Sequence, residues 1–283
     1  MKIVRAERFV EGGGFVVHRP FPVHDLSYFD PILLIDEMGP VQYGPGEAIG
    51  APDHPHRGFE TVTYVIEGEM QHEDSHGHRG AIRDGDVQWM TAGAGVVHSE
   101  MPSPEIMKNG GRMHGFQIWI NLPREKKMTQ PRYQEYSSAH LPLVNQDGVW
   151  VRVIAGEYAG KRSPIETTVP TTMLHMKLQP GATANFTIAP ESNAVVHTIE
   201  GSGVVENRDL HKHDVALIER AAEMPALKAG KDGFEVLFLS GVPLNEPVAR
   251  YGPFVMNDVN ELQQAFDDYR SGRFGEIARV GAS

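Results

Sequence analysis

Apolar residues along the chain fall in short runs separated by turn residues, and few of them recur at helical spacing. Residues 59–66, 87–90 and 116–120 are rich in Val, Ile, Thr and aromatic side chains, a composition typical of strands. Turn dipeptides such as Glu67-Gly68 lie between the runs. Short strand-like runs separated by roughly 8–12 residues predict an all-β sandwich or barrel.

A second series of strand-like runs follows the first, at residues 149–154, 172–178, 195–199, 215–218 and 234–239. Between the two series, residues 124–140 are polar and include a proline. We therefore expect an N-terminal domain over residues 1–132 and a C-terminal domain over 133–283. The length of 283 residues agrees with two domains, because single hydrophobic cores stop growing near this size.

The end of the chain shows a different periodicity. Five apolar residues recur at helical spacing, namely Val259, Leu262, Ala265, Phe266 and Tyr269. Asp258 is a suitable N-cap, and Gly272 follows the last apolar position. We predict one amphipathic helix over residues 258–271.

Two short matches relate the two halves. Residues 65–68 (VIEG) recur as residues 198–201 (TIEG), and Asp86-Val87 recurs as Asp214-Val215. A duplicated β-domain explains both matches, and so would two unrelated strands that end in turns.

Charge and composition narrow the classes of function. With 26 Lys and Arg against 37 Asp and Glu, the formal net charge is −11, so a nucleic-acid phosphate backbone is repelled on average. The absence of cysteine excludes disulfides, iron–sulfur clusters and thiolate zinc sites. We find neither the apolar segment of a signal peptide nor an apolar run of about 18 residues. We expect a cytoplasmic protein that binds neither nucleic acid nor membranes.

The first concentration of chemically active residues is the segment HPHRGFE, residues 54–60. Side chains at i, i+2 and i+4 of a strand face the same way, so His54, His56 and Glu60 would share one face. Imidazoles at i and i+2 are roughly 6–7 Å apart at the backbone and can converge on one metal ion. An isolated pair of this kind would more often be a solvated turn.

A second motif, His98-Ser99-Glu100, has the same spacing and favours a metal. If its strand lies beside the first, three imidazole nitrogens and one carboxylate oxygen converge, a donor set suited to a first-row divalent ion. Four protein ligands in an octahedral site leave two positions open for O₂ or a substrate. We predict a metal centre formed by His54, His56, His98 and Glu100.

The other histidines give weaker signals. His72, His76 and His78 lie among charged residues, so we expect a solvated hairpin or loop. His114 lies close to the strand of Trp119, where it either lines the pocket or is a buried histidine with its own partner.

The C-terminal domain lacks the metal-binding pattern. With an offset of 133 residues, the positions that match His54, His56 and His98 are Thr187, Ala189 and Lys231. None of these can form the same site, so only the N-terminal domain is expected to bind a metal.

Residues 52–102 resemble the signature of the pirin family, within the cupin superfamily. The segments QIWINLP (117–123) and YGPFVMN (251–257) are similar to further signatures of the family. The resemblance covers essentially the whole chain. It implies a bicupin, two facing antiparallel β-barrels of the jelly-roll type, with a short C-terminal helix packed back on the first barrel.

The resemblance also implies the ligand set. The family's metal ligands match His54, His56, His98 and Glu100 residue for residue, with the carboxylate in the second motif. Many other cupins take their carboxylate ligand from the first motif, where this chain has Glu60. We therefore expect Glu60 behind the ligands, oriented toward an imidazole N–H.

Pirins are similar to quercetinases, and several members cleave the flavonol quercetin with O₂ and release carbon monoxide. The resemblance thus implies an oxidoreductase, a metal-dependent quercetin 2,3-dioxygenase. Glu100 would then be both a metal ligand and the general base that deprotonates the flavonol 3-hydroxyl. Iron(II) is the expected metal, and manganese, nickel, copper, cobalt and zinc stay open.

Two other readings stay open. Some pirins are regulators whose metal controls binding to a transcription factor or a metabolic enzyme. A net charge of −11 fits contact with a basic protein partner and general solubility equally well. The third reading is a structural bicupin in which the metal site is vestigial.

Overall fold

The computed structural model describes residues 1–11, 14–221 and 225–279. The chain forms two compact units, and each is assembled from separate stretches of sequence. The N-terminal unit comprises residues 8–18 and 34–138 and the chain from Asn245 onward. The C-terminal unit comprises residues 1–7, 19–33 and 139–244.

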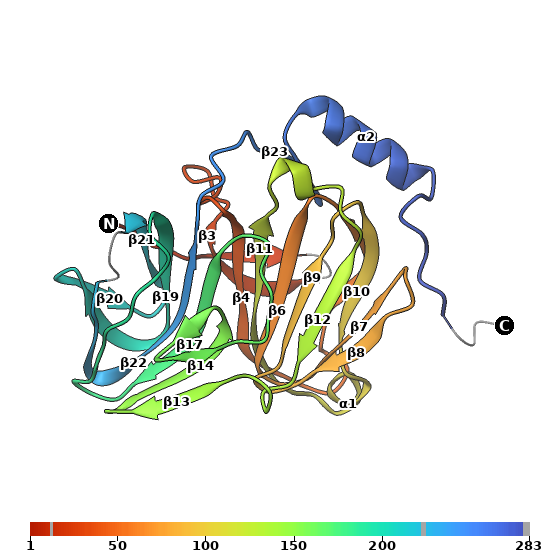
Figure 1. Ribbon diagram of the computed structural model, residues 1–283. Helices are drawn as coiled ribbons and strands as arrows, with labels where there is room; N and C mark the ends of the chain where they lie inside the picture. Colours follow the sequence, from red (N-terminus) through yellow and green to blue (C-terminus); the bar gives the residue numbers. More distant parts are fainter. Residues whose placement is uncertain (12–13, 222–224, 280–283) are drawn as a thin grey trace. The chain divides into compact units, whose positions relative to one another are not determined.

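The N-terminal unit contains the hairpin of β23 (Ala249–Tyr251) and β24 (Phe254–Met256) and two main sheets (Figure 1). The larger has the order β12 (Arg132–Tyr136), β9 (Val87–Thr91), β6 (Phe59–Glu67), β11 (Gly111–Asn121), β4 (Ile32–Tyr43), β3 (Phe15–Phe21) and β2 (Glu7–Glu11). The smaller has the order β5 (Ala51–His56), β10 (Val96–Pro102), β7 (Met70–Asp74) and β8 (Arg79–Ile82). Neighbours such as β6 and β11, or β5 and β10, run antiparallel.

One large sheet and a small hairpin build the C-terminal unit. The sheet has the order β1 (Lys2–Arg5), β21 (Asp214–Ala221), β19 (Ser192–Val205), β22 (Leu227–Gly241), β17 (Thr171–Leu178), β14 (Val149–Ala155) and β13 (Leu143–Gln146), while β18 (Thr183–Ala184) pairs with β22 and β20 (Arg208–His211) with β19. The hairpin pairs β15 (Glu157–Tyr158) with β16 (Lys161–Arg162). The inward face of the sheet is apolar, with Val151, Leu174 and Phe238 fully buried.

The helices are short and belong to the N-terminal unit. They are α1 (Pro104–Asn109), the 3₁₀ turn η1 (Arg124–Lys126) and α2 (Val259–Arg270). As predicted, Asp258 caps α2 by accepting a hydrogen bond from the Glu261 N–H, and Gly272 follows the helix in a left-handed conformation with φ 77°. No helix among the described residues has the length and apolar character needed to cross a membrane.

The predicted strand runs all lie within observed strands, and the all-β prediction is confirmed. The halves also share a pattern of neighbours. In the N-terminal unit β6 lies between β9 and β11, and in the C-terminal unit β19 lies between β21 and β22. The matched segments 65–68 and 198–201 begin in β6 and β19, so the sequence echo coincides with a repeated topology.

The ends of the chain do not follow the expected division into residues 1–132 and 133–283. Strand β1 pairs with β21 from Lys2↔Leu217 to Arg5↔Asp214, which places the first residues in the C-terminal unit. After Asn245, Phe254, Met256 and Leu262 bury themselves around Val97 of the N-terminal unit. Backbone pairing and apolar burial, both long-range effects, decide these placements.

Candidate metal centre

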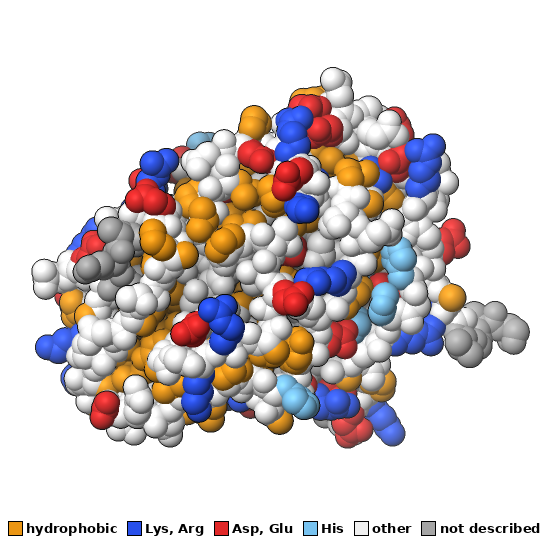
Figure 2. Space-filling model, viewed as in Figure 1, with side chains coloured by type: hydrophobic (Ala, Val, Ile, Leu, Met, Phe, Trp, Pro, Cys, Tyr) orange, Lys and Arg blue, Asp and Glu red, His pale blue; other side chains and the backbone are white. Residues whose placement is uncertain are grey.

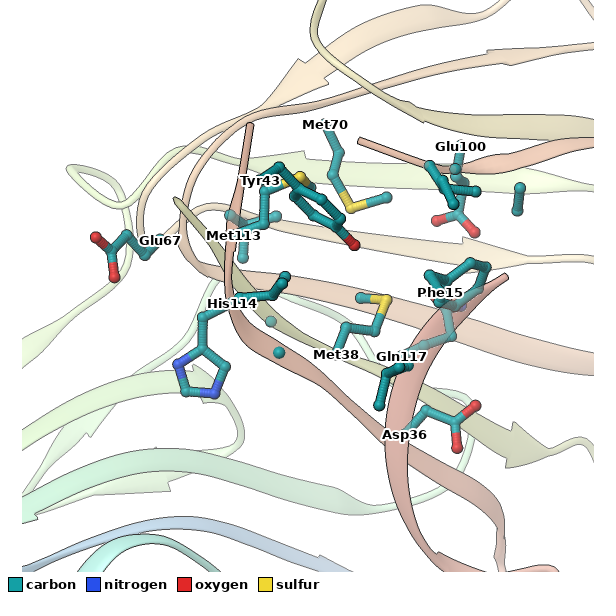
Figure 3. A pocket seen from close by; sticks show the side chains of 18 residues that line it. Phe15, Asp36, Met38, Tyr43, Glu67, Met70, Glu100, Met113, His114 and Gln117 are labelled. Carbon is teal, nitrogen blue, oxygen red and sulfur yellow. The ribbon is translucent and has the colours of Figure 1, made fainter. Parts of the chain in front are cut away.

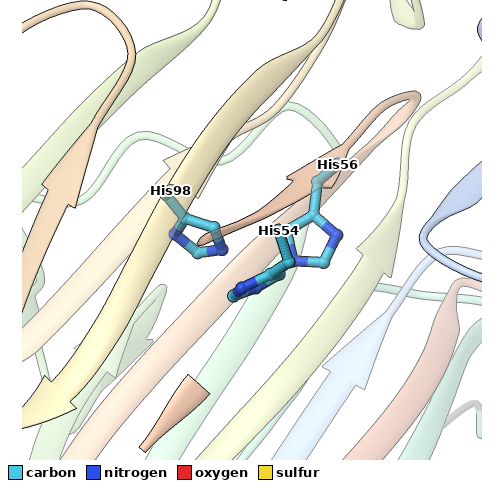
Figure 4. Close-up of side chains that lie close together, drawn as sticks. All are labelled: His54, His56 and His98. Atoms are coloured by element: carbon cyan, nitrogen blue, oxygen red, sulfur yellow. The ribbon is translucent and has the colours of Figure 1, made fainter. Parts of the chain in front are cut away.

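Strands β5 and β10 present the three predicted histidine ligands. The strands pair antiparallel with His54 directly opposite His98, and His56 opposite Val96. Directly opposed residues on neighbouring strands project to the same face of a sheet. Figure 4 shows the three imidazoles, two from β5 and one from β10, turned toward one another.

The histidines are close enough to share one ion. Nitrogen atoms of His54, His56 and His98 lie within 4.8 Å of one another. The ring centroids are 4.8 Å apart for His54–His56, 4.3 Å for His54–His98 and 4.9 Å for His56–His98. Within the described part of the chain, this tight group contains no carboxylate.

Backbone carbonyls orient two of the imidazoles. His54 Nδ1 lies 2.7 Å from the Pro52 carbonyl oxygen, and His56 Nδ1 lies 3.4 Å from that of Pro253. A carbonyl can only accept, so Nδ1 carries the hydrogen in both rings. This tautomer leaves each Nε2 lone pair free to bind a metal.

His98 gives the strongest indication that the site is built for a metal. It is fully buried, and neither ring nitrogen has a hydrogen-bond partner. Buried polar atoms normally have partners, so an orphaned imidazole between two others calls for an ion. Burial and the neighbouring histidines lower the pKa of His56 and His98 well below 6.5, which keeps both rings neutral, as metal ligands must be.

Glu100 lies on the same strand as His98 but outside the tight group. The register of β10 against β5 shifts between the two residues, so Glu100 is opposite Ala51. The Thr63 hydroxyl, from β6, lies 2.6 Å from Glu100 Oε1. The carboxylate is buried and reaches the wall of a cavity. Its role as the fourth ligand stays a prediction.

The cavity beside Glu100 is apolar apart from a few polar groups. Figure 3 shows Glu100, Gln117 and Asp36 toward one end, with the methionine side chains beside them. The larger apolar lining residues are Phe15, Met38, Tyr43, Ile49, Val65, Met70 and Met113. An apolar space with a few polar groups is typical of a small-molecule site.

The two weaker candidates lie away from the imidazole cluster. Glu60 is fully buried and accepts a hydrogen bond from Thr91, at 2.8 Å. Alternation along β6 puts Glu60 on the face opposite to Phe59, whose ring contacts His56. Its expected contact with an imidazole stays a prediction. His114 lines the cavity, and Figure 3 shows its ring pointing away from the other labelled side chains. Its Nε2 lies 2.9 Å from Glu37 Oε1.

The segment 54–60 and His72 both differ from what the sequence predicts. The chain does not continue as one strand from His54 to Glu60, because it turns at Gly58, with φ 88°. A side chain at Gly58 would overlap the Val255 carbonyl, so the turn needs glycine. His72, expected in a solvated loop, is 1% exposed on β7, because β10 pairs alongside and places Glu100 opposite it.

A cluster of three imidazoles, two of them buried, on adjacent antiparallel strands beside a carboxylate and an apolar cavity defines a cupin-type site whose residues fit a metal ion. The chain belongs to the pirin family. Residues 14–120 match the Pirin family pattern and residues 173–275 match that of the Pirin C-terminal cupin domain.

Individual relatives cover nearly the full length. A pirin-like protein of Solanum lycopersicum is 40% identical over 97% of this chain and 92% of its own. Human Pirin is 40% identical over 94% of this chain and 90% of its own. A crystal structure named quercetin 2,3-dioxygenase, from Acinetobacter baumannii, superposes with a TM-score of 0.91 at 38% identity and covers 98% of both chains.

Sequence reasoning missed the polar residues around the predicted ligands. Thr63 and Gln117 were not singled out, although Thr63 contacts Glu100 and Gln117 lines the cavity. A signal was present, since Thr61 and Thr63 alternate with apolar residues in the run from Thr61 to Ile66. A hydroxyl on a buried strand needs a polar partner. The Pro253 carbonyl left no comparable signal, because any residue could supply it.

Proposed function

We propose that this chain is a metal-dependent dioxygenase that cleaves a flavonol such as quercetin with O₂ and releases carbon monoxide. The observation that carries the proposal is the cluster of His54, His56 and His98 next to Glu100, at the wall of an apolar cavity. The relative named quercetin 2,3-dioxygenase, 38% identical over the whole chain, supports the reaction class.

In this proposal the three imidazoles and the Glu100 carboxylate hold one divalent ion. Iron(II) is the first choice, because histidine and carboxylate ligands with open positions suit non-haem iron, while manganese, nickel, copper, cobalt and zinc share the donor preference. When bound, the ion supplies open coordination positions for the oxygens of substrate and O₂. The Nδ1 contacts of His54 and His56 with backbone carbonyls preorient both rings for metal binding.

The chain's own residues prepare the substrate. Glu100 would take the proton of the flavonol 3-hydroxyl, because it is the carboxylate that reaches both the histidines' strand and the cavity. Phe15, Tyr43 and the methionines would hold the aromatic rings and exclude water. Exclusion of water protects an electron-rich substrate anion from reprotonation.

The cavity must widen to admit a flavonol. Its volume is about 90 Å³, below the roughly 300–1,000 Å³ of typical ligand pockets. Met38, Met70 and Met113 line it, and unbranched thioether side chains change rotamer readily. We therefore expect quercetin to enter by displacing methionine side chains rather than strands.

The test is anaerobic loading with iron(II), metal analysis, and then O₂ uptake and carbon monoxide release with quercetin. We expect about one metal per chain and turnover that depends on it. Glu100→Gln should lower the rate at least about 100-fold, since general-base catalysis contributes that much, with the β fold retained by circular dichroism. Normal turnover by Glu100→Gln would refute its assignment as the base.

Metal binding without any turnover would favour the regulatory reading over the enzyme. Figure 2 shows acidic and basic side chains interspersed over the viewed face, so charge does not single out a docking surface there. The discriminating measurement would then be the affinity of a partner for the apo and metal-loaded forms. Equal affinities would contradict regulation through the metal.

A further inference from the structure

One hydroxyl group, that of Thr63, contacts two residues that line the cavity, Glu100 and Gln117. Thr63 Oγ1 lies 2.6 Å from Glu100 Oε1 and 2.9 Å from Gln117 Oε1. Thr63 is 1% exposed, and it is paired with Gln117 across β6 and β11. Because Glu100 belongs to the other sheet of the unit, Thr63 joins the two sheets at the candidate metal centre.

The single hydrogen of the Thr63 hydroxyl restricts how Thr63, Glu100 and Gln117 can be hydrogen-bonded. A threonine hydroxyl carries one hydrogen and cannot donate to two oxygens at once. The shorter contact is with the carboxylate, which accepts more strongly than an amide. The hydrogen therefore belongs to the Glu100 contact, and the Gln117 amide must turn its NH₂ toward Thr63, where it donates to the hydroxyl oxygen.

The orientation of the Gln117 amide decides which of its atoms is left to contact a ligand. With its nitrogen on Thr63, Gln117 has its amide oxygen free of the Thr63 contact, and its side chain lines the space together with Glu100. An amide oxygen fixed in this way accepts a hydrogen bond from a hydroxyl and rejects a second acceptor.

We propose that Thr63 positions the Glu100 carboxylate for the metal and that Gln117 is a specificity residue that accepts a hydrogen bond from a substrate hydroxyl. The inference rests on the proposed function, because it takes Glu100 as a metal ligand. The substrate class is thereby narrowed to flat aromatic compounds with a second hydroxyl donor beyond the one that Glu100 deprotonates. Quercetin, with several hydroxyl groups, belongs to this class.

The first experiment measures cobalt(II) affinity and the cobalt absorption spectrum, without turnover. Loss of a polar partner behind a ligand typically weakens metal binding about 10- to 100-fold, and we expect that loss for Thr63→Val. Thr63→Ser keeps the hydroxyl and should stay within about threefold of wild type, with the wild-type spectrum. Wild-type affinity and spectrum in Thr63→Val would overturn the positioning role.

Thr171→Val is the matched control. It also removes a buried threonine hydroxyl, which donates to the Val169 carbonyl at 2.8 Å, but it lies in the C-terminal unit. Its cobalt affinity should equal that of wild type. If Thr171→Val weakens cobalt binding as much as Thr63→Val, the effect is one of general packing and the inference fails.

The second experiment measures quercetin binding to the cobalt-loaded protein under anaerobic conditions. We expect Gln117→Leu to lower quercetin affinity roughly three- to tenfold, the value of one neutral hydrogen bond, with cobalt affinity unchanged. A flavonol that lacks every hydroxyl except the 3-hydroxyl should bind both proteins equally. Equal quercetin affinity of Gln117→Leu and wild type would overturn the specificity role.

Glu100→Gln distinguishes failure of Glu100 as a metal ligand from failure of Thr63 as its positioning residue. If it binds cobalt as tightly as wild type, Glu100 is not a ligand and the proposed site fails. If it binds weakly while Thr63→Val binds normally, Glu100 keeps its place and only the positioning role is lost.

Discussion

At the scale of single residues, Lys127 is a cation held almost entirely out of water. It is 1% exposed, and its ammonium donates to the Gly58 carbonyl at 2.7 Å, to Asn121 Oδ1 at 2.6 Å and to the Val255 carbonyl at 3.1 Å. It thereby ties the turn after His56 to β11 and β24 (Phe254–Met256). Burial lowers the pKa of Lys127 from 10.5 to about 8.

This shift predicts a pH dependence of stability. Between pH 8 and 10.5 the unfolded chain binds a proton at Lys127 that the folded chain has released, so the free energy of unfolding rises with pH. The rise is on the order of 3 kcal/mol for a shift of this size. Below pH 8 the lysine is charged in both states and its contribution is constant.

Urea unfolding of wild type and Lys127→Met at pH 7.5, 9 and 10.5 checks the prediction. The difference between the two proteins should grow in favour of wild type as pH rises, and buried tyrosines, present in both, cancel. A difference independent of pH would contradict the assigned pKa.

At the scale of elements, α2 holds the loop that follows His56. The Arg57 guanidinium lies 2.8 Å from Asp268 Oδ2, and it stacks 4.5 Å from the ring centre of Phe274 (both in the C-terminal segment). Figure 1 shows α2 across one end of the strands of this unit. Burial alone would raise the pKa of Asp268, but hydrogen bonds from Arg57 and Gln264 outweigh it and hold that pKa low.

Asp268→Ala should destabilise the protein by about 3–5 kcal/mol, because it leaves the Arg57 cation buried without its partner. Asp267→Ala is the matched control. It removes an exposed partner of Arg270, 3.8 Å away, and should cost less than about 1 kcal/mol. Urea unfolding of both variants at pH 7 measures the difference, and equal costs would show that α2 is not anchored through Arg57.

At the scale of the whole molecule, the two units share a strand topology but differ in chemistry. The positions that match the three histidines are Thr187, Ala189 and Lys231 in the C-terminal unit. Considering only the described residues, the C-terminal unit by itself forms no metal-ligand group. Its sheet interior is packed with apolar side chains such as Val151 and Phe238, and Thr187 and Ala189 line a cavity.

We expect one metal equivalent per chain at the cluster of His54, His56 and His98. His98→Ala should lower the bound metal to near zero after gel filtration, while His211→Ala, an exposed histidine of the C-terminal unit, should retain one equivalent. Metal should also raise the melting temperature of wild type but not that of His98→Ala, because only a folded site binds it. Two equivalents in wild type, or one in His98→Ala, would contradict a single centre.

Local sequence was sufficient wherever one short segment decides the outcome. Short runs rich in Val, Ile, Thr and aromatic residues predicted β6 and β9, a second series of such runs predicted β17, and Asp258 with Gly272 predicted the ends of α2. The spacing of His54 and His56 put two imidazoles within reach of one ion. Helical periodicity and helix capping depend on residues that are neighbours along the chain, and so the sequence alone predicts them.

Only the tertiary structure decided how those segments meet. The place of β5 beside β10 brings His98 opposite His54, and the register shift after His98 turns Glu100 toward Thr63 and the cavity. The ends of the chain likewise join units far from them in sequence. Strand pairing and burial are set by the competition of distant segments for the same hydrogen bonds and the same core. The sequence therefore determined which residues carry the chemistry, and the fold determined which of them touch.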